Sequence, residues 1–369
     1  MPATKVVVNI PGEVAYNVRI GAGVLASLGQ SMRNVPSLAG AEQVLVITDT
    51  NVGPLYLSRA KASLTEVGYH VSDICVPAGE EAKSIAVIGE VWEAMAALAL
   101  ERGCVVVALG GGCVGDLAGF AAATYMRGVQ VVQVPTTLLS MVDSSVGGKT
   151  GVNLTAGKNL VGAFKQPAFV CADTDVLATL PPREWACGCG EVAKSALIDG
   201  DEFFFWLSDQ AQAMAARQAD VVAEAIARCV VFKADVVAQD KTESRGVREC
   251  LNYGHTLAHA IEKLSGYGTY SHGHAVAEGM RFAALLGESL VGTPAELAEA
   301  QAQLLDALNL PALDWKATPE NVLETMKRDK KARHGQVRFM LLEDVGAWKL
   351  VDVDDATILR HLQTYFAGK

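Results

Sequence analysis

Short apolar runs alternate with helical patterns in the first half of the chain. VLVIT at 44–48, CVVVALG at 104–110 and VQVVQVP at 129–135 are apolar almost throughout, as strands buried on both faces are. A helical pattern runs from about Asp116 to Met126, between the second and third of them. Because strands joined by helical crossovers pair in parallel, the pattern predicts a Rossmann-like parallel sheet.

From about residue 180 the pattern changes to long segments with a period of 3.6 residues and few strand signals between them. VRFMLLEDVGAWKLVDV, at 337–353, predicts a small hairpin before a last helix. Pro181-Pro182 interrupts the pattern, so we place the boundary near 176–182. We therefore expect an α/β domain over residues 1–178 and a mostly helical domain over residues 179–369.

Charge and composition exclude several classes of protein. The formal charge of −10 argues against nucleic acid or an anionic membrane as a partner. The longest apolar region, 104–125, is broken by Gly110–Gly112 and Asp116, so it does not predict a membrane span. The N-terminal apolar run is too short for a signal peptide. None of the eight cysteines forms a CxxC pair, and we interpret them as reduced thiols of a cytoplasmic protein.

A glycine turn follows the predicted strand at 104–110. GGGCVGD, at 110–116, matches G-x-G-x-x-G and opens a helix, where backbone amides can approach a pyrophosphate. The match alone is weak, because a tight strand–helix turn needs the same glycines. The acidic residue that usually follows about twenty positions later is absent, but Asp49 follows an earlier strand. The stretch indicates a dinucleotide site of an unusual arrangement.

Isolated lysines indicate an anion site. Between Gly128 and Phe164 the only charged residues are Asp143, Lys149 and Lys158, all in sequence that is glycine-rich or typical of loops. Such lysines are candidates for holding an anion, although lysines also extend to solvent without binding anything. Lys194 follows Glu191 by three residues on one helix face, and Arg248 shares a segment with His255.

Four histidines lie within twenty residues: His255, His259, His272 and His274. His255 and His259 share a helix face at i, i+4, which suits a metal site but also suits simple packing. Spacing alone leaves both interpretations open.

Several motifs together resemble one enzyme family. They are GGGCVGDLAGFAAATYMRG, VPTTLLSMVDSSVGGKTGVN, GKNLVGAF, LATLPPREW, GEVAKSALI, LNYGHTLAHAIE, HGHAVAEGM and RDKK, in family order from about residue 46 to 342. With them the chain resembles the dehydroquinate synthases, the sugar-phosphate cyclases of the shikimate pathway. The resemblance implies an N-terminal NAD-binding α/β domain, a helical C-terminal domain and an active site in the cleft between them.

The resemblance implies a different metal site from the one that spacing favours. It assigns the ligands of one catalytic Zn²⁺ or Co²⁺ to Glu191, His255 and His272, and makes His259 a neighbour of the substrate. It gives no role to His274, where many relatives carry Glu. Two cysteines, Cys187 and Cys189, stand before the first ligand, where we expect small or apolar residues.

The resemblance also implies two further sets of site residues. Those expected to contact NAD are Asp49, Glu80, Lys83, Gly111, Gly112, Asp116, Thr136, Thr137, Asp143, Lys158 and Thr179. Those expected around the substrate are Asp143, Lys149, Asn159, Lys194, Lys233, Arg248, His259 and one of Lys330 or Lys331. The segment leading to Arg248, DKTESRGVR at 240–248, is one residue longer than the family's usual form.

The implied reaction converts deoxy-arabino-heptulosonate phosphate to dehydroquinate and inorganic phosphate. It runs through oxidation by NAD, β-elimination of phosphate, reduction, ring opening and an intramolecular aldol step, so that NAD is not consumed. Three rivals remain: a related cyclase making a valiolone, an aminated quinate or a deoxy-inosose; a metal-dependent polyol dehydrogenase; and a regulatory nucleotide-binding protein without catalysis.

Arg127 adds an expectation about assembly. The resemblance places an arginine of the Y-x-R-G segment, here Tyr125–Gly128, on the substrate phosphate. Arg127 lies eleven residues after Asp116, roughly 16 Å along a helix at 1.5 Å per residue. It is then too far from the glycine turn to reach its own site, so the resemblance predicts a homodimer. A preference of arginine for helix C-termini is the alternative explanation.

Overall fold

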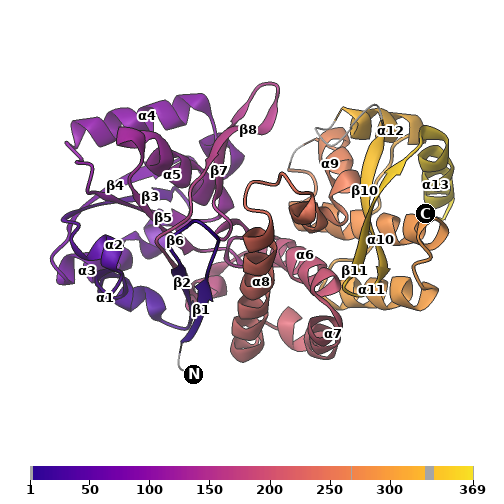
Figure 1. Ribbon diagram of the computed structural model, residues 1–369, viewed down its shortest axis with the longest axis horizontal. Helices are drawn as coiled ribbons and strands as arrows, with labels where there is room; N and C mark the ends of the chain where they lie inside the picture. The colour runs from indigo at the N-terminus through magenta and orange to yellow at the C-terminus, as the bar shows by residue number, and fades with distance from the viewer. Residues whose placement is uncertain (1–2, 267, 329–335, 369) are drawn as a thin grey trace. The chain divides into compact units, whose positions relative to one another are not determined.

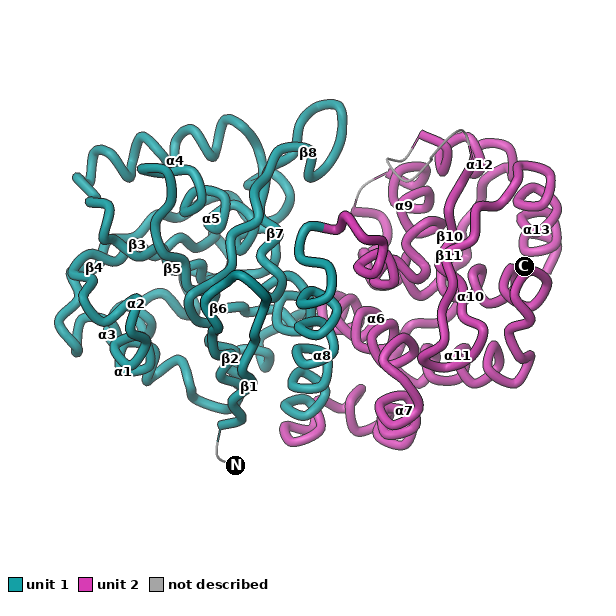
Figure 2. The backbone as a smooth tube through the Cα atoms, viewed as in Figure 1, with its two compact units in different colours: residues 1–181, 222–242 teal, residues 182–221, 243–369 magenta. Residues whose placement is uncertain are grey.

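The computed structural model describes residues 3–266, 268–328 and 336–368, and these residues group into two compact units. Unit 1 comprises Met1–Pro181 and Val222–Thr242, and unit 2 comprises Pro182–Val221 and Glu243–Lys369 (Figure 2). Unit 1 is therefore built from two separate stretches of the sequence.

A twisted sheet forms the centre of unit 1. Among the described residues it has seven strands in the order β1-β2-β9-β6-β5-β3-β4. All pairs are parallel except β1 with β2, which confirms the parallel sheet expected from the sequence. The strands are β1 (Thr4–Val8), β2 (Tyr16–Gly21), β3 (Gln43–Asp49), β4 (His70–Val76), β5 (Val105–Gly110), β6 (Gln130–Pro135) and β9 (Phe169–Asp173).

Helices lie on both sides of this sheet, as Figure 1 shows. On one side are α4 (Ile85–Ala97) and α5 (Gly112–Thr124); on the other are α1 (Leu28–Arg33), α2 (Pro36–Ala39) and α3 (Ser58–Glu66). Strands β3 and β5 are buried on both faces, which explains why they read as continuous apolar runs.

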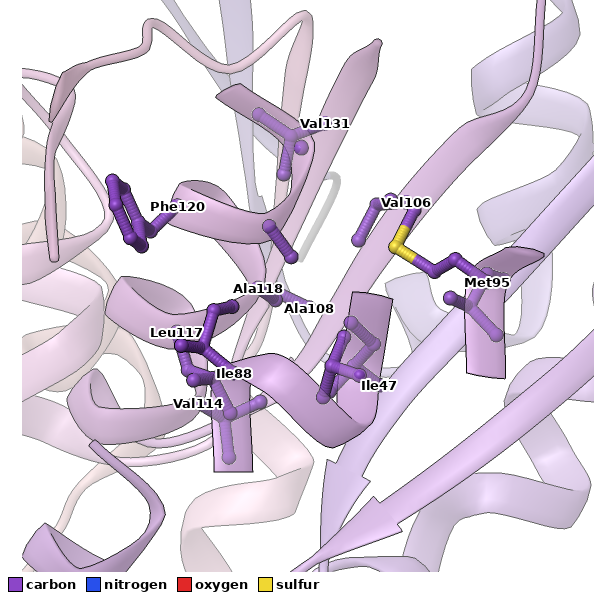
Figure 3. Packing of buried hydrophobic residues seen from close by; sticks show 14 of the residues in the cluster. Ile47, Ile88, Met95, Val106, Ala108, Val114, Leu117, Ala118, Phe120 and Val131 are labelled. Carbon is purple, nitrogen blue, oxygen red and sulfur yellow. The ribbon is translucent and has the colours of Figure 1, made fainter. Parts of the chain in front are cut away.

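The core under α4 and α5 is one apolar cluster. Figure 3 shows Leu117 and Phe120 of α5 and Met95 of α4 in the same cluster as Ile47 and Val106 of the sheet. Full burial of side chains of this size contributes roughly 1.5–3 kcal/mol each. This packing fixes the helix that follows the glycine turn.

Two local predictions are wrong. Helix α5 begins at Gly112, not at about Asp116, because the glycine turn itself supplies the first helical residues. Lys149 and Lys158 do not lie in loops but in an antiparallel hairpin, β7 (Lys149–Leu154) with β8 (Gly157–Phe164). Gly151 and Gly162 face each other there, and a Cβ on Gly151 would stand 2.5 Å from the carbonyl oxygen of Val161.

Unit 2 is mostly helical, as expected, with one small sheet. Strands β10 (Val337–Asp344) and β11 (Ala347–Val353) form the predicted hairpin before the last helix. The helices are α6 (Pro182–Asp199), α7 (Asp201–Ala215), α9 (His255–Leu264), α10 (His272–Leu290), α11 (Ala295–Ala307), α12 (Pro319–Lys327) and α13 (Asp355–Ala367). Helix α8 (Ala219–Gln239) belongs to unit 1 from Val222 onwards. No helix among the described residues is long and apolar enough to cross a membrane.

Candidate active site

The carboxyl ends of the central strands of unit 1 meet at one edge of the sheet. Thr48 of β3 pairs with Leu109 of β5, and Gly110 of β5 pairs with Pro135 of β6. Asp49, the glycine turn at 110–112 and Thr136 therefore leave the sheet side by side. Ligands of open parallel sheets bind at this edge.

The glycine turn leaves no room for side chains. A Cβ on Gly110 would stand 2.6 Å from Val114, and one on Gly111 would stand 3.1 Å from Thr137. The turn is thus close-packed on its protein side, and it opens α5 with Gly111 as the N-cap. Backbone amides at such a helix start favour an anionic group.

A partly buried ion pair lies beside this turn, with Lys83 buried and the Asp116 side chain 21% exposed. The Lys83 Nζ donates to Asp116 Oδ2 at 2.6 Å and to Asn159 Oδ1 at 2.5 Å, joining α5 to the β7–β8 hairpin. Burial would lower the pKa of Lys83, but the Asp116 carboxylate raises it above its ordinary value, so the lysine stays charged. Burial raises the pKa of Asp116, although Lys83 opposes this.

A hollow of about 360 Å³ lies next to the ion pair. Glu80 lines it and accepts from Asn153 Nδ2 at 2.8 Å, and Lys158 Nζ lies 3.2 Å from Glu80 Oε1. Burial would raise the pKa of Glu80, but Lys83, Asn153 and Lys158 together lower it. Five of the residues expected to contact NAD or substrate thus form one charged cluster: Glu80, Lys83, Asp116, Lys158 and Asn159.

Other residues of the expected dinucleotide set are held by local bonds. Asp49 Oδ1 accepts from the backbone N–H groups of Asn51 and Val52, both at 2.8 Å. The hydroxyl of Thr179 lies 2.6 Å from that of Tyr56. Thr137 exchanges hydrogen bonds with Ser140.

In unit 2, glycine contacts bring three helices together. A Cβ on Gly190 of α6 would stand 2.7 Å from the carbonyl oxygen of Gly273 in α10. Gly254, just before α9, has φ +78°, and a Cβ there would stand 2.6 Å from the carbonyl oxygen of Val276 in α10. Because of these close approaches, the residues that directly follow Gly190 and Gly254 lie near the residue that directly precedes Gly273.

Those three residues are Glu191, His255 and His272, and their ligand atoms all lie within 4.8 Å of one another. Glu191 Oε1 is 3.4 Å from His272 Nε2 and 3.7 Å from His255 Nε2. Figure 1 shows the helices from which they come, α6, α9 and α10. Glu191 is 1% exposed, so its carboxylate is removed from water.

The charges of this cluster are partly compensated within the protein. Lys194 donates to Glu191 Oε2. Burial would raise the pKa of Glu191, but Lys194 and His272 hold it well below its ordinary value. Burial would likewise lower the pKa of His272, but the nearby Glu191 and Glu262 carboxylates raise it to about 10. The carboxylate therefore stays ionised.

The cluster suits a divalent metal ion. Among the described residues, none bonds to the buried Glu191 Oε1, an orphaned acceptor that a cation would satisfy. One carboxylate and two imidazole nitrogens are the donor set of catalytic zinc sites that keep an open position. The residues present thus fit the metal that the resemblance implies.

The other two histidines of the sequence cluster lie outside this group. The His259 ring is 5.7 Å from that of His255, nearly perpendicular to it, and does not belong to the three-residue cluster. The His274 Nδ1 lies 2.6 Å from Ser271 Oγ. Spacing alone pairs His255 with His259, whereas the structure gathers His255 with His272 and Glu191.

The cations expected around the substrate differ in their burial. Lys194 and Arg248 are buried, at 2% exposure each, while Lys149 is exposed at the start of β7. In unit 1, Lys233 Nζ donates to Asp143 Oδ1 at 2.6 Å and to the Asp143 carbonyl oxygen. Arg127 is exposed in the short turn Tyr125–Arg127 after α5. Lys330 and Lys331 lie outside the described residues.

Three residues of these sites were not found from the sequence. Glu262 lies 3.4 Å from His272 Nδ1, the Tyr253 carbonyl oxygen lies 3.1 Å from His255 Nδ1, and Asn153 bonds to Glu80. For Glu262 a signal exists, because it lies seven residues after His255 on one helix face. For the other two the sequence gives none.

Comparisons with known proteins identify the family of the chain. The family model described as 3-dehydroquinate synthase N-terminal matches residues 73–187, and the C-terminal model matches residues 188–332. The chain belongs to the 3-dehydroquinate synthase family. A 3-dehydroquinate synthase of Acidithiobacillus ferrooxidans is 45% identical, over 96% of each chain. Glu191, His255 and His272 all lie inside the C-terminal match.

Two solved structures are similar to this 3-dehydroquinate synthase family member in fold. One is 2-deoxy-scyllo-inosose synthase with carbaglucose-6-phosphate, NAD⁺ and Co²⁺, with a TM-score of 0.88 and 28% identity over 98% of this chain and 99% of that one. The other is 2-epi-5-epi-valiolone synthase from Streptomyces hygroscopicus with NAD⁺ and Zn²⁺, with a TM-score of 0.83 and 26% identity over 98% and 99%. These cyclases of other products are less similar in sequence than the dehydroquinate synthase.

Proposed function

We propose that the protein is a 3-dehydroquinate synthase. It converts 3-deoxy-D-arabino-heptulosonate 7-phosphate to 3-dehydroquinate and inorganic phosphate, as a carbon–oxygen lyase that depends on NAD and one divalent metal ion. The observation that carries the proposal is the buried Glu191–His255–His272 cluster, in a chain that belongs to this family over both halves.

The metal, Zn²⁺ or Co²⁺, would be held by Glu191, His255 and His272. When bound, it polarises a substrate hydroxyl and lowers the pKa of that hydroxyl. NAD would lie along the carboxyl edge of the unit 1 sheet, against the glycine turn and the Lys83–Asp116 pair. When bound, it takes up a hydride and later returns it, so that none is consumed.

The protein's own cations would hold the substrate phosphate during elimination. The phosphate takes the proton from the carbon next to the transient ketone, the carbon–oxygen bond breaks, and the electron pair forms a carbon–carbon double bond. Inorganic phosphate leaves with the proton. Lys149, Lys194 and Arg248 need only position that group, and the burial of Lys194 and Arg248 strengthens their attraction for it.

Polar side chains would orient the rest of the substrate. We assign Asp143, Asn159, Lys233 and His259 to its hydroxyl and carboxylate groups, together with one of Lys330 or Lys331. Lys233 already fixes the Asp143 carboxylate, so that side chain is preorganised. Ring opening and the aldol step then require that the open-chain intermediate be kept in a folded conformation.

Arg127 completes the phosphate site in this proposal and requires a homodimer. It leaves α5 at the end opposite the glycine turn, so we assign it to the site of a second subunit. Its exposure beyond the end of α5 supports this assignment.

One assay separates the candidate functions. The protein should release phosphate from the heptulosonate phosphate with substoichiometric NAD and without net NADH. Stoichiometric NADH would instead indicate a polyol dehydrogenase, and phosphate release only from a different sugar phosphate would indicate a cyclase of another product. Binding of NAD without turnover of any of these would contradict an enzymatic function.

A further inference from the structure

The two cluster histidines are oriented by different acceptors. The Nδ1 of His255 faces the Tyr253 carbonyl oxygen at 3.1 Å, whereas the Nδ1 of His272 faces the Glu262 carboxylate at 3.4 Å. In both rings this leaves Nε2 directed at Glu191 Oε1. One ring is therefore held by a neutral oxygen and the other by a charged one.

Position and burial suit Glu262 to this contact. Glu262 lies two turns after His255 on α9, so its side chain projects on the same face, towards the start of α10. Its side chain is only 15% exposed. A carboxylate removed from most of the water interacts strongly with a ring N–H. Helix α9 thus supplies both His255, a member of the cluster, and Glu262, the hydrogen-bond acceptor for His272.

Glu262 does not belong to the metal cluster itself. Within the part of the chain that the structure describes, the group whose ligand atoms lie within 4.8 Å contains Glu191, His255 and His272 but not Glu262. Glu262 contacts Nδ1 of the His272 ring, whereas Nε2 of that ring faces Glu191. A single metal ion at Nε2 is beyond its reach.

We propose that Glu262 is a positioning residue of the metal centre. By accepting the Nδ1–H of His272, it fixes the tautomer with a free lone pair on Nε2, and it fixes the rotation of the ring. A negative acceptor also makes the imidazole a stronger donor to a cation than a carbonyl would. The inference rests on the proposed function only in that it requires a divalent metal ion at the cluster.

The test measures metal affinity without turnover. Zn²⁺ is titrated into metal-free wild type, Glu262→Ala and Glu262→Gln in competition with a chromophoric chelator, and Co²⁺ absorption spectra are recorded for each. Loss of the hydrogen-bond acceptor that orients a metal-binding histidine typically weakens metal binding by about 10–100-fold. We expect that loss for Glu262→Ala, a smaller loss for Glu262→Gln, whose amide oxygen still accepts, and an altered Co²⁺ spectrum for Glu262→Ala. Glu296→Gln, an exposed change on α11, serves as the control and should leave affinity unchanged.

Three outcomes would overturn the inference. Wild-type affinity and spectrum in Glu262→Ala would show that the carboxylate does not position the ring. Loss of stoichiometric binding in Glu262→Gln, equal to that in His272→Ala, would make Glu262 a direct ligand. If Glu262→Ala fails to fold, equal affinity of the folded Glu262→Gln and Glu262→Asp variants with wild type would refute the proposal. Failure of wild type to bind metal would contradict the proposed function instead.

Discussion

Gly279 of α10 packs directly against the carbonyl oxygen of Gly254, the residue that precedes His255, and a Cβ at position 279 would overlap that oxygen. The position of a candidate metal ligand therefore depends on a glycine that lies 24 residues further along the chain. Backbone cannot move aside as a flexible side chain can, so this contact makes the spacing of α9 and α10 intolerant of change.

Gly279→Ala should therefore weaken both the fold and the metal site. Overpacking of this kind typically costs about 1–3 kcal/mol, and the displaced α9 should carry His255 away from Glu191. Thermal unfolding and Zn²⁺ titration measure the two effects. Gly89→Ala in α4 is the matched control: a Cβ there meets nothing within 4 Å, so it should stabilise the fold by about 0.5–1 kcal/mol. Unchanged Zn²⁺ affinity in folded Gly279→Ala would show that the contact does not set the site.

Removal of a cluster histidine should separate metal ligands from substrate neighbours. A chelator should abolish activity, and Zn²⁺ or Co²⁺ should restore it at one ion per chain. His272→Ala should lose the metal because two donors remain, whereas His259→Ala should keep it. Metal analysis of the purified variants decides the matter. The reverse pattern would show that the cluster is wrongly assigned.

Loss of Lys149 should affect phosphate elimination without affecting NAD. Lys149→Ala and Lys194→Ala should both lose most phosphate release while calorimetry still detects NAD binding, since these cations are assigned to the substrate. Lys149→Ala is the cleaner of the two, because Lys194 also neutralises the buried Glu191. Abolished NAD binding in either folded variant would move that lysine to the dinucleotide site.

Changes to the Lys83–Asp116 pair should affect the stability of the fold and the binding of NAD differently. Lys83→Met leaves the Asp116 carboxylate, which is 21% exposed, without its cation, and leaving such a partly buried group unpaired costs about 1–3 kcal/mol. Lys83→Met combined with Asp116→Asn should recover part of that stability, because no unpaired charge remains, yet NAD binding should stay weak. Denaturant unfolding and NAD calorimetry test the two halves. Full NAD affinity in the double variant would exclude the pair from the dinucleotide site.

Mixed subunits should show whether Arg127 acts in a neighbouring site. Arg127→Ala and Lys194→Ala, each inactive, are refolded together to form heterodimers. If Arg127 enters the partner's site, each heterodimer holds one complete site and activity reappears at about a quarter to a half of the wild-type level, from one site in two. Native mass spectrometry confirms that heterodimers form. Inactive heterodimers would place Arg127 in its own subunit's site or in neither.

The sequence predicted those features that depend on neighbours along the chain. Strands β3, β5 and β6 were predicted because burial on both faces leaves few polar positions in them. The start of α5 was placed a few residues too late because glycine has a low helix propensity, and the β7–β8 hairpin was missed because its glycines resemble a loop.

The candidate metal cluster shows why spacing along the sequence was insufficient to find it. Glu191 precedes His255 by 64 residues, and contacts such as that of Gly190 with Gly273 bring α6 to α10. Periodicity describes one helix at a time, so it favoured His259, which is on the same helix as His255. The family resemblance supplied the tertiary information that periodicity lacks.

The composition of unit 1 from two stretches has a consequence for synthesis on the ribosome. A nascent chain that ends at Pro181 contains every strand of the large sheet but lacks Val222–Thr242, which carries Lys233, the partner of Asp143. Unit 1 therefore cannot reach its final fold until more than sixty further residues have emerged, including all of α6 and α7. This chain therefore cannot complete the folding of unit 1 before synthesis of unit 2 begins.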